Sequence, residues 1–234
     1  MKKSEYVTEI MQQYDLVNVL SRKEGSEVLR LRHKTLERDI VLRVYNEGCN
    51  AYEALKSIKH ENLPIIYDAL NFDDGQIIFE EFVDGITVAQ ILEDDKYNYH
   101  SAKEVIKAVC NALVTLHGMY IIHRDIKPEN IMINTKGEVK LLDFNASRIH
   151  SIDKQTDTVV LGTIGYASPD QFGISQSDEK SDIYAVGVLL NVMLTGKHPS
   201  EALAKGKAGK IVLKCTQIDP KSRFKSVKKL VDAL

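Results

Sequence analysis

Apolar and polar positions divide the chain into a strand-rich first third and a helix-rich remainder. β-branched and aliphatic residues fill three short runs separated by polar breaks, at 15–20, 27–32 and 39–45, which predicts three strands. Two further strands are expected at 65–72 and 76–83, joined by a tight turn. Before them, apolar residues stand at helical spacing and are followed by a proline, so a short helix is expected over 51–60.

The remaining two thirds of the chain have the pattern of helices. One amphipathic stripe predicts a long helix and consists of Val105, Ile106, Val109, Leu113 and Leu116. Residues 181–194 are apolar on nearly every side, as in a buried helix, which Gly196 is placed to end. A further short helix is expected at 201–206. Strands followed by helices predict an α+β protein of two lobes, with an N-lobe at about 1–82, a hinge at 83–86 and a C-lobe at about 87–234.

Composition narrows the class of protein. Of the 234 residues 44% are hydrophobic, which excludes disorder as the main state, and the formal charge of −2 argues against a nucleic-acid partner. The longest apolar run, 183–194, is too short to cross a bilayer, so no membrane association is expected. Cys49, Cys110 and Cys215 are odd in number and widely spaced, which favours a reducing compartment, the cytoplasm.

The charges are distributed unevenly along the chain. Residues 61–95 carry ten acidic side chains and no Lys or Arg, whereas residues 205–229 carry nine basic side chains and one acid. Two solvated faces are the ordinary interpretation of such runs. The alternative is a docking surface for an acidic partner at the basic C-terminal end, around Lys205, Lys207 and Lys210.

Candidate chemistry is concentrated in two segments, HRDIKPENIMI and LLDFNAS. The first places Asp125, Lys127 and Asn130 in one loop after the long helix, and Asp143 follows beyond an expected hairpin. This set suits phosphoryl transfer. Asp125 can accept or orient a hydroxyl proton, and Lys127 can neutralise charge on the moving phosphate. Asn130 and Asp143 supply oxygen ligands of the kind that Mg²⁺ prefers.

With these residues the sequence resembles the eukaryotic-like protein kinases, and Lys127 is typical of their serine/threonine branch. The resemblance covers nearly the whole chain and implies one protein kinase domain, 1–234, of the small bacterial type. It implies phosphate transfer from ATP to Ser or Thr hydroxyls of a protein, with the chain itself as a further candidate substrate. It also implies Mg²⁺ as the metal, with Mn²⁺ as an alternative, Asp125 as the base, and Asn130 and Asp143 as metal ligands. The sequence does not identify the protein substrate.

Other segments extend the resemblance along the second lobe. GTIGYASPDQF resembles the end of a kinase activation segment, with Asp170 in place of the usual glutamate. CTQIDPKSRF resembles the closing segment of the family, which implies a salt bridge between Arg223 and Asp170. Asp182, at the start of the apolar helix, is implied to hold the backbone of the catalytic loop.

The resemblance also implies an ATP site in the first lobe. Backbone groups of Glu81 and Val83 are implied to bind adenine, which makes Glu80 an unusually polar gatekeeper. The strand and loop positions implied to contact the nucleotide are Ser21, Lys23, Val28, Val41 and Arg43.

This lobe departs from the family at its phosphate-binding positions. Ser21, Lys23 and Ser26 stand where the family has three glycines, and Arg43 replaces the strand lysine. The exchange is not conservative, because Arg is longer and forked. Three interpretations remain open: Arg43 contacts the α- and β-phosphates, Arg43 is a solvated strand residue, or Lys23 supplies the displaced charge. The with-no-lysine kinases resemble the third case.

The helix glutamate that pairs with this cation in the family is also displaced. Its position falls on Ala51, and the neighbouring candidates are Glu47 and Glu53. Glu53 lies about 200° further round a helix than residue 51 and would point elsewhere. Glu47 could meet Arg43 if the helix begins early.

Asn145 replaces the glycine that usually follows the Asp-Phe pair. Asn tolerates a left-handed backbone better than most residues, so the turn is expected to survive this replacement. Phe144 is then expected to favour the inward over the outward position, while Asp143 is intact as a metal ligand.

The segment beyond Asn145 contains candidate regulatory positions. Arg124 is expected to pair with a phosphate on Thr156 or Thr158, which would order the loop. An ordinary polar loop is the alternative. Thr163 is implied to hydrogen-bond the catalytic Asp and Lys instead.

Two main classes of function remain open. An active serine/threonine kinase is favoured, because every group that acts on the γ-phosphate is present. A pseudokinase, acting as a nucleotide-binding or scaffold module, is the alternative, because the strand lysine, the helix glutamate and the loop glycines are replaced. A small-molecule kinase is less favoured, because GTIGYASPDQF resembles a protein-substrate loop.

Overall fold

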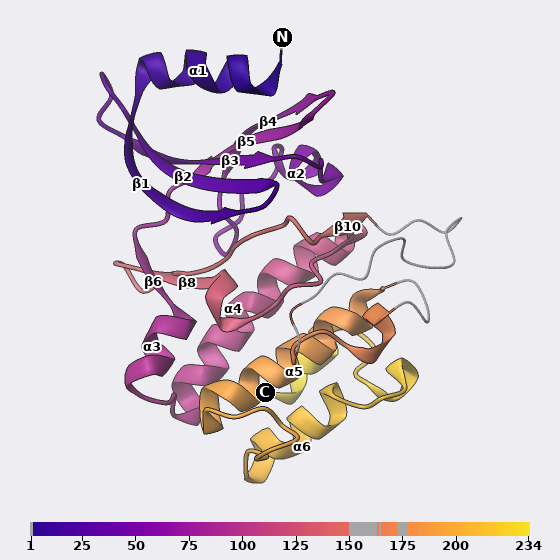
Figure 1. Cartoon of the computed structure of the whole chain (residues 1–234). Helices are drawn as coiled ribbons and strands as arrows, with labels where there is room; N and C mark the ends of the chain where they lie inside the picture. Colours follow the sequence, from indigo (N-terminus) through magenta and orange to yellow (C-terminus); the bar gives the residue numbers. More distant parts are fainter. Residues whose placement is uncertain (1, 150–162, 164, 173–176) are drawn as a thin grey trace. The chain divides into compact units, whose positions relative to one another are not determined.

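The computed structural model describes residues 2–149, 163, 165–172 and 177–234, which form two compact units. Unit 1 comprises Met1–His60 and Pro64–Asp84, and unit 2 comprises Glu61–Leu63 and Gly85–Leu234. Unit 1 is mostly sheet and unit 2 mostly helix (Figure 1), which is the α+β composition expected from the sequence. The boundary after Asp84 falls within the range 83–86.

Unit 1 is a five-stranded antiparallel sheet with two helices. Its elements are α1 (Lys3–Gln13), β1 (Tyr14–Lys23), β2 (Ser26–His33), β3 (Asp39–Tyr45), α2 (Asn50–Leu55), β4 (Ile66–Phe72) and β5 (Gly75–Glu81). The strands are ordered β1-β2-β3-β5-β4. All five strands were predicted, from runs of β-branched and aliphatic residues bounded by polar breaks or turns, and each contains most of its predicted range.

The helix α1 was not predicted, although it covers one face of this sheet. Ile10 is buried in one cluster with Leu29, Leu31, Leu42 and Ile77 from the strands. The signal was present in the sequence, because the apolar residues of α1 recur at helical spacing.

Lys3 fastens the start of α1 to the edge of the sheet. Its ammonium donates to the backbone carbonyls of Tyr45 and Asp74, at 2.8 Å each, and to the side-chain oxygen of Asn46 at 2.9 Å. The side chain is 8% exposed. Because a buried ammonium needs several acceptors, these three oxygens together permit its burial.

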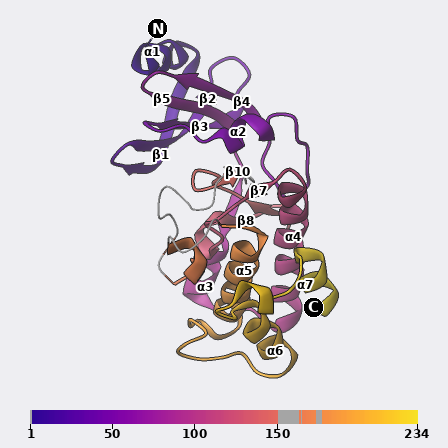
Figure 2. The same ribbon diagram turned by 90° about the vertical axis from the view of Figure 1, so that its right-hand side faces the viewer.

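Unit 2 is built around long helices. Its elements are β6 (Gly85–Thr87), α3 (Val88–Asp94), α4 (Tyr99–Gly118), β7 (Ile121–Ile122), β8 (Ile131–Asn134), β9 (Val139–Leu141), β10 (Arg148–Ile149), α5 (Glu179–Thr195), α6 (Gly206–Cys215) and α7 (Val227–Ala233). The helix α5 packs against α4, α6 and α7 (Figure 2). As predicted, α5 is buried on most sides and ends at Gly196, whose φ is 71°.

The short helix expected at 201–206 does not form, and α6 begins only at Gly206. The connection instead contacts Asn191, a fully buried polar side chain on α5 that must find hydrogen-bond partners. Its amide bonds backbone groups of the connection after α5, at 2.8 Å each: the carbonyls of Lys197 and Ala202 and the N–H of Ala204.

None of the helices in the described ranges combines the length and the apolar character that crossing a bilayer requires. All three cysteines are buried free thiols.

Candidate active site

The catalytic-loop candidates come together in unit 2, in the connection between β7 and β8. The Asp125 carboxylate accepts the Thr163 hydroxyl at 2.6 Å and lies 2.8 Å from the Lys127 ammonium. Lys127 also donates to the Thr163 hydroxyl oxygen at 2.7 Å. The Asn130 amide donates to the backbone carbonyl and the carboxylate of Asp125, at 2.8 and 2.9 Å. Thr163 therefore makes both contacts expected of it.

These contacts determine the charge state of Asp125. Burial by itself would raise the pKa of Asp125, but hydrogen bonds from Lys127 and Thr163 and the Lys127 charge lower the pKa overall. The carboxylate is therefore ionised near neutral pH, where it acts only as a hydrogen-bond acceptor. It can accept a hydrogen bond from a substrate hydroxyl.

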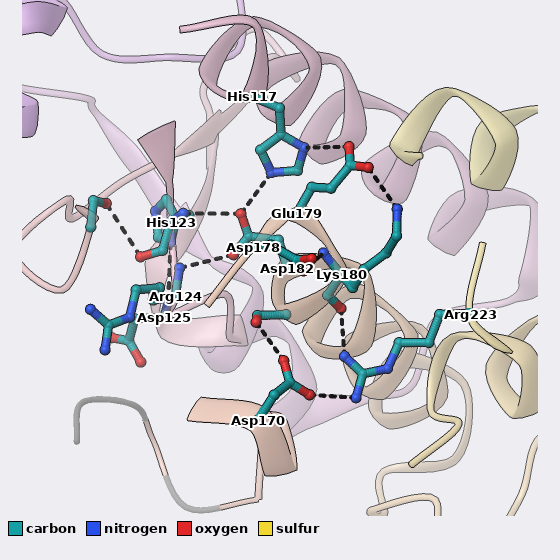
Figure 3. A network of polar contacts seen from close by, with 12 residues as sticks. His117, His123, Arg124, Asp125, Asp170, Asp178, Glu179, Lys180, Asp182 and Arg223 are labelled. Carbon is teal, nitrogen blue, oxygen red and sulfur yellow. Dashed lines mark hydrogen bonds and ion pairs between the residues drawn. The ribbon is translucent and has the colours of Figure 1, made fainter. Parts of the chain in front are cut away.

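Asp182, in the first turn of α5, anchors the backbone that precedes the base (Figure 3). Its carboxylate accepts the N–H groups of His123 and Arg124 at 2.9 Å each, and the His117 ring lies 2.8 Å from it. Arg124 has a φ of 69°, a left-handed conformation that is costly for a residue with a side chain. Asp182 supports this conformation and thereby fixes the position of the backbone that leads into Asp125.

Asp143 is brought beside this loop by the backbone. The N–H of Leu142 donates to the carbonyl of Asn130 at 2.8 Å. The expectation that Asn145 adopts a left-handed conformation is wrong. Asp143 has it instead, with a φ of 65°, and its carboxylate accepts the Asn145 N–H at 3.3 Å. The turn itself is closed by the backbone, where the N–H of Ser147 donates to the carbonyl of Phe144 at 2.9 Å.

Phe144 is fully buried, and its ring meets that of His123 edge-on with centroids 5.4 Å apart. Burial lowers the pKa of His123, more than the neighbouring carboxylates raise it. The imidazole is therefore neutral near pH 7 and packs as an aromatic ring against Phe144.

Asn130 and Asp143 fit the requirements of a magnesium ion. The amide nitrogen of Asn130 is committed to Asp125, so its amide oxygen is the atom that could bind a metal. Within the described ranges no cluster of three or more His, Cys, Asp or Glu could hold a metal ion by itself. Mg²⁺ is typically bound by one or two protein groups and completed by substrate phosphates and water, so these two ligands suffice.

The predicted pair between Arg223 and Asp170 forms, at 2.6 Å (Figure 3). The other Asp170 oxygen accepts the hydroxyls of Ser168 and Ser181 at 2.9 and 2.7 Å. Burial would raise the pKa of Asp170, but the hydrogen bonds from Arg223 and Ser181 lower it overall. Arg223 also donates to the backbone carbonyl of Lys180 at 2.9 Å, so the pair joins the segment before α5 to that helix.

The residues of β1, β2 and β3 assigned to the nucleotide share one face of the sheet, opposite to the face that α1 covers. Strand register determines this, because opposed residues share a face and alternate residues return to it. Register places on this face Ser21, Lys23, Val28, Val41, Arg43 and Glu80. Lys23 is exposed at the end of the hairpin, next to the tight turn at Gly25.

The partner of Arg43 differs from the expected one. Arg43 is 7% exposed, so the interpretation as a solvated strand residue is wrong. Glu47 does not meet it, because α2 begins only at Asn50 and Glu47 stays exposed in the loop before it. The guanidinium instead pairs with Glu80 on β5, at 2.6 Å. The sequence contained a signal for this pair. Glu80 places a charge in the apolar strand 76–83, and a buried charge needs a partner of opposite sign.

The hinge positions have partly committed backbone groups. The N–H of Glu81 donates to the carbonyl of Ile65 at 2.8 Å, and the Glu81 carboxylate accepts the Ile65 N–H at 2.9 Å. A contact of Glu81 with adenine is thereby limited to its carbonyl. Val83 is buried. Thr156 and Thr158 lie outside the described residues.

The hydrogen-bonded cluster of Asp125, Lys127, Thr163 and Asn130, with Asp143 beside it, is the arrangement expected of a protein kinase. The chain belongs to the protein kinase family. The protein kinase domain matches residues 7–232.

Three bacterial serine/threonine-protein kinases are similar to this chain in sequence. The chain is 36% identical over 148 residues to a probable serine/threonine-protein kinase PknB of Lactococcus lactis, covering 62% of this chain and 24% of the relative. It is 33% identical over 183 residues to the serine/threonine-protein kinase PrkC of Bacillus subtilis, covering 77% of this chain and 28% of the relative. It is 32% identical over 204 residues to the serine/threonine-protein kinase PknB of Mycobacterium leprae, covering 80% of this chain and 33% of the relative. The chain thus spans about a third or less of these relatives.

Proposed function

We propose that the chain transfers the γ-phosphoryl group of ATP to Ser or Thr hydroxyls of a protein. The observation that carries this proposal is the cluster around Asp125. Its carboxylate is ionised and held by Lys127, Asn130 and Thr163 in one hydrogen-bonded group. The names of the bacterial relatives, which are serine/threonine-protein kinases, support the choice of substrate hydroxyl.

In this reaction the substrate hydroxyl donates a hydrogen bond to Asp125 and attacks the γ-phosphorus. The bond from that phosphorus to the oxygen of ADP breaks, and the hydroxyl proton passes to Asp125. Lys127 stabilises the charge on the moving group. Asn130 and Asp143 would hold a Mg²⁺ or Mn²⁺ ion, which supplies charge neutralisation at the phosphates.

The test is transfer of labelled phosphate from Mg-ATP to the chain itself and to a generic basic protein. Asp125→Asn keeps the size of the side chain but removes the base, so the rate should fall by a factor of about 10²–10⁴. Asp178→Asn is the matched control, because Asp178 caps α5 near the site and Asn caps equally well. Phosphoamino-acid analysis should give phosphoserine or phosphothreonine.

A pseudokinase would behave differently in the same assay. It would bind nucleotide and transfer no phosphate, and Asp125→Asn would change nothing. That outcome would refute the proposed activity. Replacing Mg²⁺ by Mn²⁺ in the assay decides which ion supports the reaction.

We also propose that an acidic protein segment docks on the outer face of α6. Lys205, Lys207, Lys210 and Lys214 are exposed there, together with the half-exposed Leu213, and residues 202–218 contain no acid. This face therefore offers positive charge next to apolar surface, which complements a segment rich in Glu and Leu.

A labelled peptide of alternating Glu and Leu residues tests this docking surface by fluorescence anisotropy. Binding should weaken as salt is raised and should be lost when Lys205, Lys207 and Lys210 are changed to Glu. Charge reversal at Lys59 and Lys136, which are not part of α6, is the control. Equal binding by the α6 variant would contradict the proposal.

Phosphorylation of Thr156 or Thr158 with Arg124 as its partner, and a cytoplasmic location, stay predictions. Mass spectrometry after incubation with Mg-ATP tests the first. The three buried free thiols support a reducing compartment.

A further inference from the structure

An arginine–carboxylate pair is buried in the sheet of unit 1. The Arg43 Nε donates to one Glu80 oxygen at 2.6 Å, and a terminal guanidinium nitrogen donates to the other at 3.1 Å. The two side chains are 8% and 2% exposed. Arg43 also donates to the Tyr45 hydroxyl at 3.3 Å. A two-point contact of this kind fixes the orientation of the guanidinium as well as its position.

The strand ladder fixes the geometry of this pair. β3 and β5 are adjacent antiparallel strands, in which Val41 lies opposite Glu80 and Arg43 lies opposite Ile78. Arg43 and Glu80 are therefore diagonal neighbours on one face, within reach of a long side chain. A one-residue slip between the strands would place Arg43 and Glu80 on opposite faces of the sheet, so the register of β3 against β5 is a condition for this pair.

The helix α2 does not supply this carboxylate. Its position closest to the family glutamate is Ala51, which is buried. Glu47 is exposed before the helix, and Glu53 pairs with Lys56 at 2.8 Å on its surface. The acidic group that orients the strand cation thus comes from the sheet.

Arg43 keeps its charge in this setting. Burial lowers its pKa, but the Glu80 carboxylate together with Tyr52 and Tyr45 raises the pKa well above its usual value. A permanent, oriented cation consequently lies on the sheet face that also carries Ser21, Lys23 and Val28.

We propose that Glu80 is the positioning residue for Arg43, and that this pair within the sheet replaces the strand lysine and helix glutamate of protein kinases. Glu80 directs the guanidinium to the phosphates of ATP from β5, so nucleotide binding does not depend on the placement of α2. The proposal rests on the proposed use of ATP as substrate.

Calorimetric titration with Mg-ATP and, separately, with adenosine tests this role. Glu80→Gln should weaken ATP binding about tenfold and leave adenosine binding within about twofold, because only ATP carries the phosphates. Arg43→Gln should weaken ATP binding at least as much. The double variant should be no weaker than Arg43→Gln, since Glu80 acts through Arg43. Glu47→Gln and Glu53→Gln are matched controls and should bind ATP normally.

Glu80→Gln leaves a buried guanidinium without its counter-charge and could prevent folding. Glu80→Asp then provides the test, because it keeps the charge and shortens the reach; ATP affinity should fall several-fold with adenosine affinity preserved. Normal ATP affinity in the Glu80 variants, additive losses in the double variant, or equal losses for adenosine would overturn the proposal.

Failure of the proposed function has a different signature. A chain that binds Mg-ATP through Arg43 and Glu80 but transfers no phosphate refutes the kinase activity and leaves this inference standing. A chain that does not bind ATP refutes both.

Discussion

Asp182→Asn isolates the contribution of one buried carboxylate to the catalytic loop. Asp182 is fully buried, and its two oxygens accept three hydrogen bonds, from the backbone N–H groups of His123 and Arg124 and from the His117 ring. Asn has almost the same shape but only one acceptor oxygen. The change therefore alters hydrogen bonding and charge without creating a cavity.

The position of the three donors predicts which bond is lost. His123 and His117 share one oxygen, whereas Arg124 alone uses the other. The Asn oxygen should take the position with two donors, which turns its NH₂ group toward the Arg124 N–H. A buried unpaired N–H costs about 1–3 kcal/mol, and each bond that loses its ionic character costs about 1 kcal/mol. The expected loss of stability is about 3–5 kcal/mol.

Urea unfolding followed by circular dichroism measures this loss. With an m-value of about 3 kcal/mol per M, the midpoint should fall by about 1 M or more. Arg124 would also lose the support for its left-handed φ, so Asp125 would shift and the rate of phosphate transfer should fall up to about 100-fold. Asp178→Asn should change stability by less than about 0.5 kcal/mol, because the helix cap is preserved.

The dependence on pH provides a further check. Burial raises the pKa of Asp182, but the His117 contact and the other donors lower it overall. A carboxylate whose folded pKa is depressed stabilises the fold above its unfolded pKa of about 3.9, and this contribution is lost as the pH falls through the folded pKa. The stability gap between the parent chain and Asp182→Asn should therefore be full at pH 7 and shrink below about pH 4. A gap under 1 kcal/mol at pH 7, or one that widens in acid, would refute the reasoning.

Two further predictions concern packing and the base. Gly187→Ala would place a methyl group onto the side chain of Cys215 where α5 meets α6, so it should cost about 1–3 kcal/mol in thermal unfolding; an unchanged Tm would mean that α6 moves aside freely. Thr163→Val removes the hydroxyl that donates to Asp125, so the pKa of Asp125 should rise and the acidic limb of the kcat/KM profile should move to higher pH. A limb that stays or moves to lower pH would count against this role of Thr163.

Local patterns were sufficient for much of the fold. The strands were recognisable as runs of β-branched and aliphatic residues between polar breaks, and α5 was recognisable because it is apolar on most sides. The spacing of Asp125, Lys127 and Asn130 was equally informative, since three functional groups in one short loop leave little freedom in how they meet.

The errors concern interactions between distant segments. The partner of Arg43 depends on the register of β3 against β5, which no single segment encodes. The connection before α6 depends on Asn191, a side chain on another helix. In the turn after β9, the positive φ fell on Asp143 rather than on Asn145, so the preference of Asn for a left-handed backbone did not identify the residue that adopts it.

The helix α1 sets a practical limit on how far unit 1 can be shortened. A chain that began at the first strand would lose Ile10 from the apolar cluster. It would also lose the hydrogen bonds from Lys3 to Tyr45, Asn46 and Asp74. Leu29, Leu31 and the neighbouring strand residues would then face water as one apolar surface, which invites aggregation. A shortened protein could thus lose activity through insolubility while every catalytic residue remained in place.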